Sequence, residues 1–135
     1  MELSEDLLFK CAAVELTLNN VRAVILSVYR TPNADIELHL EKIDILLNKL
    51  VNDPILIFLA GDFNINILRD NCNSAALLSL LGSYDLLPRI FEPTRLSNGA
   101  QSCIDNIFTN CNNFTAEVLL YSYFGPHRPD GDIPA

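Results

Sequence analysis

The sequence lacks the segments that direct proteins into or across membranes. A transmembrane helix needs a run of about 18 or more apolar residues, and the 135-residue chain contains no such run. Its N-terminus, Met-Glu-Leu-Ser-Glu-Asp, is acidic and lacks the basic region that begins a signal peptide. We therefore expect a nuclear or cytoplasmic protein with no membrane partner.

The sequence also lacks the short motifs of zinc and nucleotide sites. The four cysteines are Cys11, Cys72, Cys103 and Cys111. None of them belongs to a C-x-x-C pair, and no histidine cluster accompanies them, so we expect free thiols and no zinc site. There is no P-loop and no G-x-G-x-x-G, which leaves no nucleotide-binding motif of these kinds.

Basic residues are scarce, and the formal net charge is −8 with a pI near 4.5. Tight, non-specific binding to nucleic acid depends on clustered Lys and Arg, so the charge argues against that function. It leaves room for a nuclease that contacts phosphate through a metal ion, because such sites are rich in Asp, Glu and Asn.

The remaining composition is that of a folded domain. Half of the residues are hydrophobic and 19% are charged, which is enough apolar material for a sizeable core. The length predicts one domain or part of a larger one. We find no internal repeat and no linker that divides the chain.

The first half predicts a hairpin followed by a helix. Alternating residues at 12–18 and β-branched residues at 22–29 flank Asn19-Asn20, which is typical of an antiparallel hairpin. Apolar residues at helical spacing then predict an amphipathic helix over 36–51 that packs on a sheet. Asn33 or Asp35 could cap this helix.

The second half continues the alternation of strands and helices, which predicts an α/β fold with a mixed sheet and packing helices. The expected elements are a buried strand from Ile55, a loop over 65–73, a helix over 74–81 capped by Ser74 and ended by Gly82, a short strand within 86–91, a loop over 92–101, and strands over 103–109 and 116–123.

The buried strand Ile55–Ala60 runs into Gly61, and Asp62 and Asn64 follow at once. Ligands of open α/β sheets bind at the carboxyl ends of strands, so Asp62 and Asn64 could belong to a site there. The alternative is a strand-to-loop turn in which Asp and Asn bond their own backbone. The residues alone favour neither interpretation.

Further polar residues stand near the ends of predicted elements. Tyr29 could donate a hydrogen bond to phosphate or be an ordinary strand-end aromatic. Asp105 could orient a histidine or pair with a loop amide. His39 lies off the apolar stripe of its helix and is expected to be solvated, and His127 lies in a proline-rich tail. No histidine–carboxylate pair is therefore evident.

The order of several motifs resembles the endonuclease/exonuclease/phosphatase superfamily. The motifs are Val28-Tyr-Arg-Thr-Pro-Asn33, Gly61-Asp-Phe-Asn64, Glu92-Pro-Thr-Arg95 and Ser102-Cys-Ile-Asp-Asn-Ile-Phe-Thr-Asn110. The likeness covers roughly residues 11–121. Within the superfamily, the motifs resemble most strongly the apurinic-type endonuclease domain of non-LTR, jockey-like retrotransposons.

This resemblance implies the C-terminal half of a four-layer, DNase I-like α/β sandwich that hydrolyses DNA phosphodiester bonds with Mg²⁺. Tyr29 would contact the scissile phosphate, and Asn64 would bind phosphate or help hold the site. Asp62 would position or deprotonate the attacking water, and Asp105 would orient a catalytic histidine. The metal would act as a Lewis acid.

The chain departs from the family pattern at both ends. Members of the family carry an Asn and a metal-binding Glu on strands of an upstream half. This chain shows no counterpart of them, because Glu2, Glu5 and Glu15 do not stand in that motif. The final Ser-Asp-His is also missing. We therefore expect residues 1–123 to form a partial domain without its principal metal ligand and without nuclease activity.

The tail over 124–135 suggests an origin for the missing motif. It has three prolines and two glycines and no periodicity, so a disordered tail is expected. Codons can be chosen for it that, read one nucleotide later, give Ser-Asp-His-Thr-Gly-Gln-Met-Val-Thr-Phe-Pro. A frameshift would explain this, and the sequence of the locus tests it.

Two other functions stay open. Half a sandwich leaves a sheet face and its edges uncovered, which would favour self-association as a non-catalytic binding or assembly module. Alternatively, a missing N-terminal segment or a separate chain could complete an active endonuclease.

Overall fold

The computed structural model describes residues 9–51 and 54–119. The main sheet has five strands in the order β1-β2-β3-β7-β4, and β5 and β6 form a separate pair. The strands are β1 (Phe9–Leu18), β2 (Val21–Arg30), β3 (Leu56–Asp62), β4 (Leu87–Pro88), β5 (Arg95–Ser97), β6 (Ala100–Ser102) and β7 (Asp105–Thr109). The helices are α1 (Ile36–Leu50) and α2 (Cys72–Gly82).

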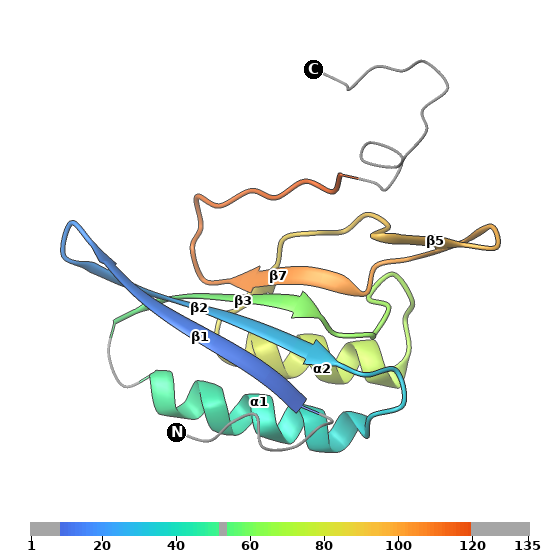
Figure 1. The fold of residues 1–135 in the computed structure, drawn as a ribbon, viewed down its shortest axis with the longest axis horizontal. Helices are drawn as coiled ribbons and strands as arrows, with labels where there is room; N and C mark the ends of the chain where they lie inside the picture. Colours follow the sequence, from blue (N-terminus) through green and yellow to red (C-terminus); the bar gives the residue numbers. More distant parts are fainter. Residues whose placement is uncertain (1–8, 52–53, 120–135) are drawn as a thin grey trace, which may run out of the picture.

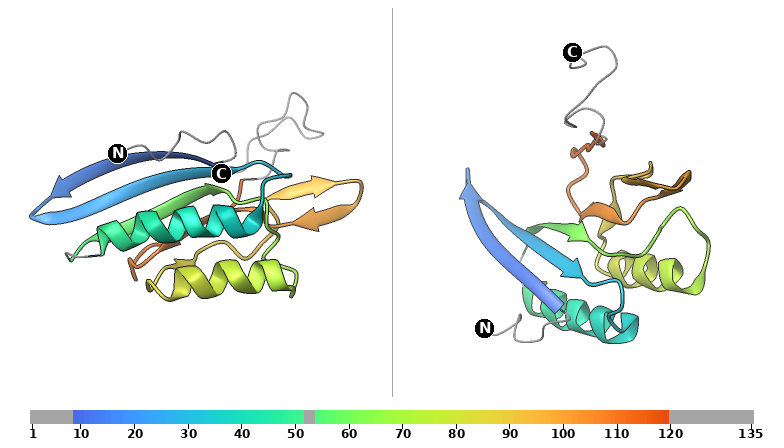
Figure 2. Two further views of the ribbon diagram at one scale, coloured as in Figure 1. Left: turned by 90° about the horizontal axis from the view of Figure 1, so that it is seen from below. Right: turned by 45° about the vertical axis from the view of Figure 1, so that its right-hand side comes forward.

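The described residues form two layers, because α1 and α2 both lie on the same face of the sheet (Figures 1 and 2). The sheet is mixed: β2 and β3 are parallel, while β1–β2, β3–β7 and β4–β7 are antiparallel. A mixed sheet with packing helices confirms the predicted α/β class. Neither helix of the described residues is long and apolar enough to cross a membrane.

The predicted hairpin is confirmed. β1 and β2 pair along their full length, ending with Leu18 opposite Val21. Asn19 and Asn20 both have positive φ, at 51° and 65°, as a two-residue type I′ turn requires. Asn tolerates this region better than most residues, so the Asn19-Asn20 pair fixes the register of the hairpin.

The core lies between one sheet face and the two helices. Alternate residues of β2 and β3 point into it, so each strand has one buried face. The buried hydrophobic residues of this core are Val24, Leu26, Val28, Ile43, Leu46, Leu47, Ile57, Leu59, Phe63, Ile65, Leu77, Leu81, Leu86 and Phe108.

Helix α1 confirms one prediction and corrects another. Asp35 is the N-cap, and its Oδ1 accepts a hydrogen bond from Glu37 N at 2.9 Å. His39, however, is only 2% exposed, so the expectation of a solvated histidine is wrong. It lies one helical turn before Ile43 and therefore faces the core with it.

Helix α2 begins earlier than predicted. Its N-cap is Asn71, whose side chain accepts hydrogen bonds from Asn73 N and Ser74 N, both at 3.0 Å. Ser74 is the third residue of the helix, and its hydroxyl accepts from Asn71 N at 3.2 Å. The reciprocal pair is a capping box, so the predicted cap at Ser74 is wrong by three positions.

Two predictions in the last third also need correction. The segment 92–101, which was expected to be a loop, forms most of the β5–β6 hairpin. Its Asn98-Gly99 turn has positive φ at both residues, which is a strong hairpin signal. The strand expected over 116–123 is not formed by residues 116–119, and the rest of that range lies outside the described residues. There the backbone N–H of Val118 donates to the Glu92 side chain instead of to a strand.

Candidate functional site

Three of the predicted site residues form one row across neighbouring strands. Tyr29 of β2 is in register with Asp62 of β3, and Asp62 is in register with Asp105 of β7. Residues in register point to the same face of a sheet. That face is opposite the helices, because Val28, next to Tyr29, is buried in the core. The structure therefore brings Tyr29, Asp62 and Asp105 together.

The row depends on a close approach between β2 and β3. Gly61 has φ +151° and is in register with Val28. A Cβ at position 61 would lie 1.9 Å from the carbonyl oxygen of Val28. Only glycine allows this backbone conformation and this separation. Gly61 thus brings Asp62 to the end of β3 beside Tyr29.

Asp62 forms the turn that one interpretation of its sequence predicted, while its role in a ligand site stays a prediction. Its Oδ1 accepts a hydrogen bond from Asn64 N at 3.0 Å, as in an Asx turn, while its Oδ2 accepts one from Arg95 at 3.2 Å. Burial is the main cause that raises the pKa of Asp62, and nearby Asp105 adds to it. The Asn64 N–H, Arg95 and Arg30 act in the opposite direction.

The side chain of Asn64 bonds to the backbone. It has φ +51°, and its side-chain amide donates to the carbonyl oxygen of Arg30. The amide therefore ties the loop after β3 to the end of β2. A role of Asn64 in holding the site agrees with this geometry, while phosphate binding by the same side chain stays a prediction.

Arg30 stabilises the same loop through hydrogen bonds to its backbone. Its guanidinium donates to three carbonyl oxygens, those of Phe63 at 2.8 Å, Ala34 at 2.7 Å and Asn64 at 2.7 Å. Arg30 is 3% exposed, and this burial lowers its pKa. Sequence reasoning missed this role. The alternation of β2 gave a signal, because Arg30 follows Val24, Leu26 and Val28 on the buried face.

Arg95 ends the Glu92-Pro-Thr-Arg95 motif, and the sequence predicts no role for it. Its side chain donates to Asp62 Oδ2 at 3.2 Å and lies 3.5 Å from Asp105 Oδ2, measured from Nε. Thr94 fixes the neighbouring backbone, since its Oγ1 accepts hydrogen bonds from Ile104 N and Asp105 N at 3.1 and 3.2 Å. Arg95 therefore completes the polar site at the base of the β5–β6 hairpin.

The structure does not place a histidine beside Asp105 within residues 9–51 and 54–119. Asp105 contacts Arg95 instead. His39 lies on α1, across the sheet from the row, and burial followed by the charge of Arg30 lowers its pKa to about 4. His127 lies outside the described residues. The prediction that Asp105 orients a histidine stays untested.

A divalent metal does not fit the residues of this row by themselves. The described part of the chain contains no group of three or more His, Cys, Asp or Glu that could hold a metal ion. Only Asp62 and Asp105 face each other, and Arg95 contacts both carboxylates. Mg²⁺ binds through oxygen ligands, so it would have to compete here with a guanidinium.

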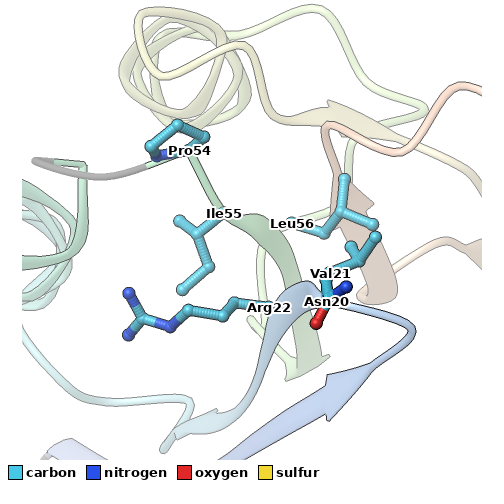
Figure 3. A pocket seen from close by; sticks show the side chains of 6 residues that line it. All are labelled: Asn20, Val21, Arg22, Pro54, Ile55 and Leu56. Carbon is cyan, nitrogen blue, oxygen red and sulfur yellow. The ribbon is translucent and has the colours of Figure 1, made fainter.

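A pocket of about 620 Å³ lies at the other end of the sheet. It is lined by Asn20, Val21, Arg22, Pro54, Ile55 and Leu56, which come from the hairpin turn and the start of β3 (Figure 3). No carboxylate lines it, and Arg22 already pairs with Glu15. The pocket is therefore separate from the polar row and offers no comparable set of reactive groups.

Two solved structures share the fold of this chain. One is the endonuclease domain of TRAS1, a telomere-specific non-LTR retrotransposon, with 23% identity and a TM-score of 0.62 over 73% of this chain and 47% of that one. The other is an endonuclease/exonuclease/phosphatase family protein from Leptotrichia buccalis C-1013-b, with 19% identity and a TM-score of 0.56 over 75% of this chain and 42% of that one.

These likenesses confirm the fold that the motifs predicted. The chain spans less than half the length of either structure. No protein-family model and no curated protein matches the sequence. The described residues therefore share the fold of part of each of these two structures.

Proposed function

We propose that this chain is part of a nuclear or cytoplasmic endonuclease domain of the non-LTR retrotransposon type and that its polar row faces the DNA phosphate. The observation that carries the proposal is the register of Tyr29, Asp62 and Asp105 across β2, β3 and β7. Residues distant in sequence converge at one end of the sheet, where α/β folds bind ligands.

Each residue of the row has a chemical role in this proposal. Tyr29 is 39% exposed, so its hydroxyl can donate to a phosphate oxygen. Asp62 would accept a proton from water or position it, as a general base. Asp105 and Asn64 would hold the surrounding geometry. The Mg²⁺ that the resemblance implies would need ligands from outside the described residues, and it would supply charge stabilisation at the phosphate.

We further propose that the chain by itself does not hydrolyse DNA. Among the described residues, Asp105 contacts a guanidinium and no imidazole, and no third metal ligand joins the two carboxylates. Loss of a general acid or base alone costs about 10²–10⁴ in rate. A segment that supplies the missing ligands would restore activity.

A plasmid-nicking assay tests both parts of the proposal. Wild-type protein and Asp62→Ala are compared with Mg²⁺, and equal background nicking is expected. Clear nicking that Asp62→Ala abolishes would contradict the proposed inactivity. DNA contact is tested separately by fluorescence anisotropy with a labelled duplex at low salt, where Tyr29→Phe should weaken binding. If neither protein binds, the assignment of the row to phosphate fails.

A second candidate function is self-association, because the open face of the hairpin is apolar. Val14, Leu16, Val21 and Ile25 are between 39% and 54% exposed. Their register places them on the face opposite the helices. A second copy of the chain fits this face, since a two-fold contact needs a patch that complements itself, and these four side chains carry no charge.

Light scattering during size-exclusion chromatography tests this candidate. The wild type should form a dimer that Leu16→Lys dissociates. Thr17→Lys is the matched control, because Thr17 is also exposed but points to the other face of β1. A wild-type monomer at every concentration would rule the candidate out.

A further inference from the structure

The polar row carries two like charges that would repel a phosphate. Asp62 and Asp105 are directly opposite in the β3–β7 pair, and like charges at such positions also destabilise the pairing. Arg95 compensates both effects, because its Nη2 lies 3.2 Å from Asp62 Oδ2 and its Nε lies 3.5 Å from Asp105 Oδ2. A phosphate that approaches the row therefore meets a guanidinium together with the carboxylates.

The guanidinium of Arg30, at the end of β2, is not available to such a ligand. Arg30 is 3% exposed, and its side chain donates to carbonyl oxygens of the backbone behind the row. The side chain of Arg95, in contrast, is 56% exposed. Of these two arginines, Arg95 is the one that a ligand on the open side of the sheet can touch.

Arg95 has donors left for this contact. A guanidinium presents its N–H groups in one rigid plane with two usable edges. The Nε–Nη2 edge faces the carboxylates of Asp62 and Asp105. Within residues 9–51 and 54–119, no acceptor bonds to Nη1. The Nη1–Nη2 edge is therefore open, and such an edge matches two oxygens of one phosphate.

The backbone keeps Arg95 beside the row. Thr94 N donates to Ser102 O at 2.8 Å, which closes the base of the β5–β6 hairpin. The Thr94 hydroxyl accepts from Asp105 N at 3.2 Å, which ties this base to β7. The hairpin fixes the Cα of Arg95 and the carboxylates orient its guanidinium, so binding a phosphate would order little that is not already ordered.

We propose that Arg95 binds a backbone phosphate of DNA through the Nη1–Nη2 edge of its guanidinium, while Asp62 and Asp105 hold the opposite edge. This inference rests on the proposed function, which places DNA at the row, and it adds the residue that supplies positive charge there. Phosphate contacts carry no sequence information directly, so Arg95 should strengthen binding to any duplex by a similar factor.

The salt dependence of duplex binding, measured by fluorescence anisotropy with the full chain, tests the proposal. Each phosphate that a protein neutralises adds about 0.9 to the slope of log K against log salt concentration. Arg95→Gln should therefore lower the slope by about 0.9 and weaken binding roughly tenfold at about 50 mM salt, equally for two duplexes of unrelated sequence. Arg95→Lys retains the charge and should retain most of the slope.

A matched control separates this contact from a general charge effect. Lys49→Gln removes one positive charge from an exposed position of α1, on the other face of the sheet (Figure 1), and should leave the slope unchanged. Circular dichroism verifies that each variant is folded. An equal loss of slope in Lys49→Gln would overturn the proposal.

The same measurements distinguish this inference from the proposed function. If Tyr29→Phe weakens binding while Arg95→Gln keeps the affinity and slope of the wild type, the role of Arg95 is refuted and the proposed function stands. If the wild type binds no duplex at any salt concentration, both are refuted.

Discussion

The carbonyl oxygen of Val28 lies in the space that a side chain on Gly61 would need. A Cβ built on Gly61 would be 1.9 Å from this oxygen and 2.9 Å from its carbon. Both atoms belong to the backbone of a central strand, so they cannot turn aside as the end of a flexible side chain can. The pairing of β2 with β3, and with it the whole polar row, requires glycine at this position.

Gly61→Ala should therefore destabilise the protein by more than about 4 kcal/mol, which is exceptional for one substitution. Gly82→Ala is the matched control, because a Cβ at Gly82 would meet nothing within 4 Å. Its free energy of unfolding should change by no more than about 1 kcal/mol. Urea denaturation followed by circular dichroism measures both. Similar midpoints for the two variants would contradict the predicted clash.

Arg30→Lys should also be strongly destabilising. A lysine ammonium cannot reproduce the three bonds from Arg30 to the carbonyls of Phe63, Ala34 and Asn64. Bonds from a charged donor each contribute about 1.5–3 kcal/mol, so we expect a loss of at least about 2 kcal/mol. Arg22→Lys, whose side chain is 44% exposed and pairs with Glu15, should change stability by less than about 1 kcal/mol.

The stability of the fold should decrease in mild acid because of His39. Burial and the charge of Arg30 lower the pKa of His39 from 6.5 to about 4. Between these values the unfolded chain binds a proton that the folded chain does not, so stability is full above about pH 6.5 and falls toward pH 4 by on the order of 2–3 kcal/mol.

His39→Gln isolates this effect. Its free energy of unfolding should fall less than that of the wild type between pH 7 and pH 4.5, as measured by urea denaturation. The raised pKa of Asp62 acts with the opposite sign, because the folded state then retains a proton that the unfolded state has lost. That contribution is common to both proteins. Parallel stability curves would exclude His39 as the cause.

Asn110 substitutes for a backbone partner at the start of β3. Its Oδ1 accepts from Ile57 N at 2.9 Å, and its Nδ2 donates to Ile55 O at 3.1 Å. Asn110→Ala should cost about 1–3 kcal/mol, the usual penalty for unsatisfied buried polar groups. Asn112→Ala, at an exposed position, should be neutral. Amide hydrogen exchange at Ile57 should accelerate only in the first variant.

The sequence predicted those parts of the fold that local patterns determine. The two-residue period of β1 and β2, the Asn19-Asn20 turn and the helical stripe of α1 each depend on neighbours in sequence. The run ending in Gly61-Asp62 predicted a strand with polar residues at its carboxyl end. The resemblance then assigned Tyr29 and Asp105 to the same site, and the strand register brings them together.

The missed features depend on contacts between distant segments. Nothing near Arg95 in sequence reveals that it meets Asp62, because the contact joins the β5–β6 hairpin to β3. The prediction that His39 is solvated was wrong for a related reason. It followed from the polarity of the side chain, whereas the position of His39 on the helix faces the sheet. The wrong start of α2 and the missed β5–β6 hairpin have a different cause, because the signals for both lie in the neighbouring sequence. Asn71 and Asn98-Gly99 carried recognised signals within segments assigned to loops.

The position of the polar row on the open side of the sheet has a thermodynamic consequence. Tyr29 shares this side with Ile25 and Val14, so a second layer of protein on the hairpin would extend toward the row. A ligand bound there would then meet both layers. By linkage, any ligand that binds the two-layer form more tightly must strengthen its assembly by the same factor. Assembly state and site occupancy would then be one coupled equilibrium.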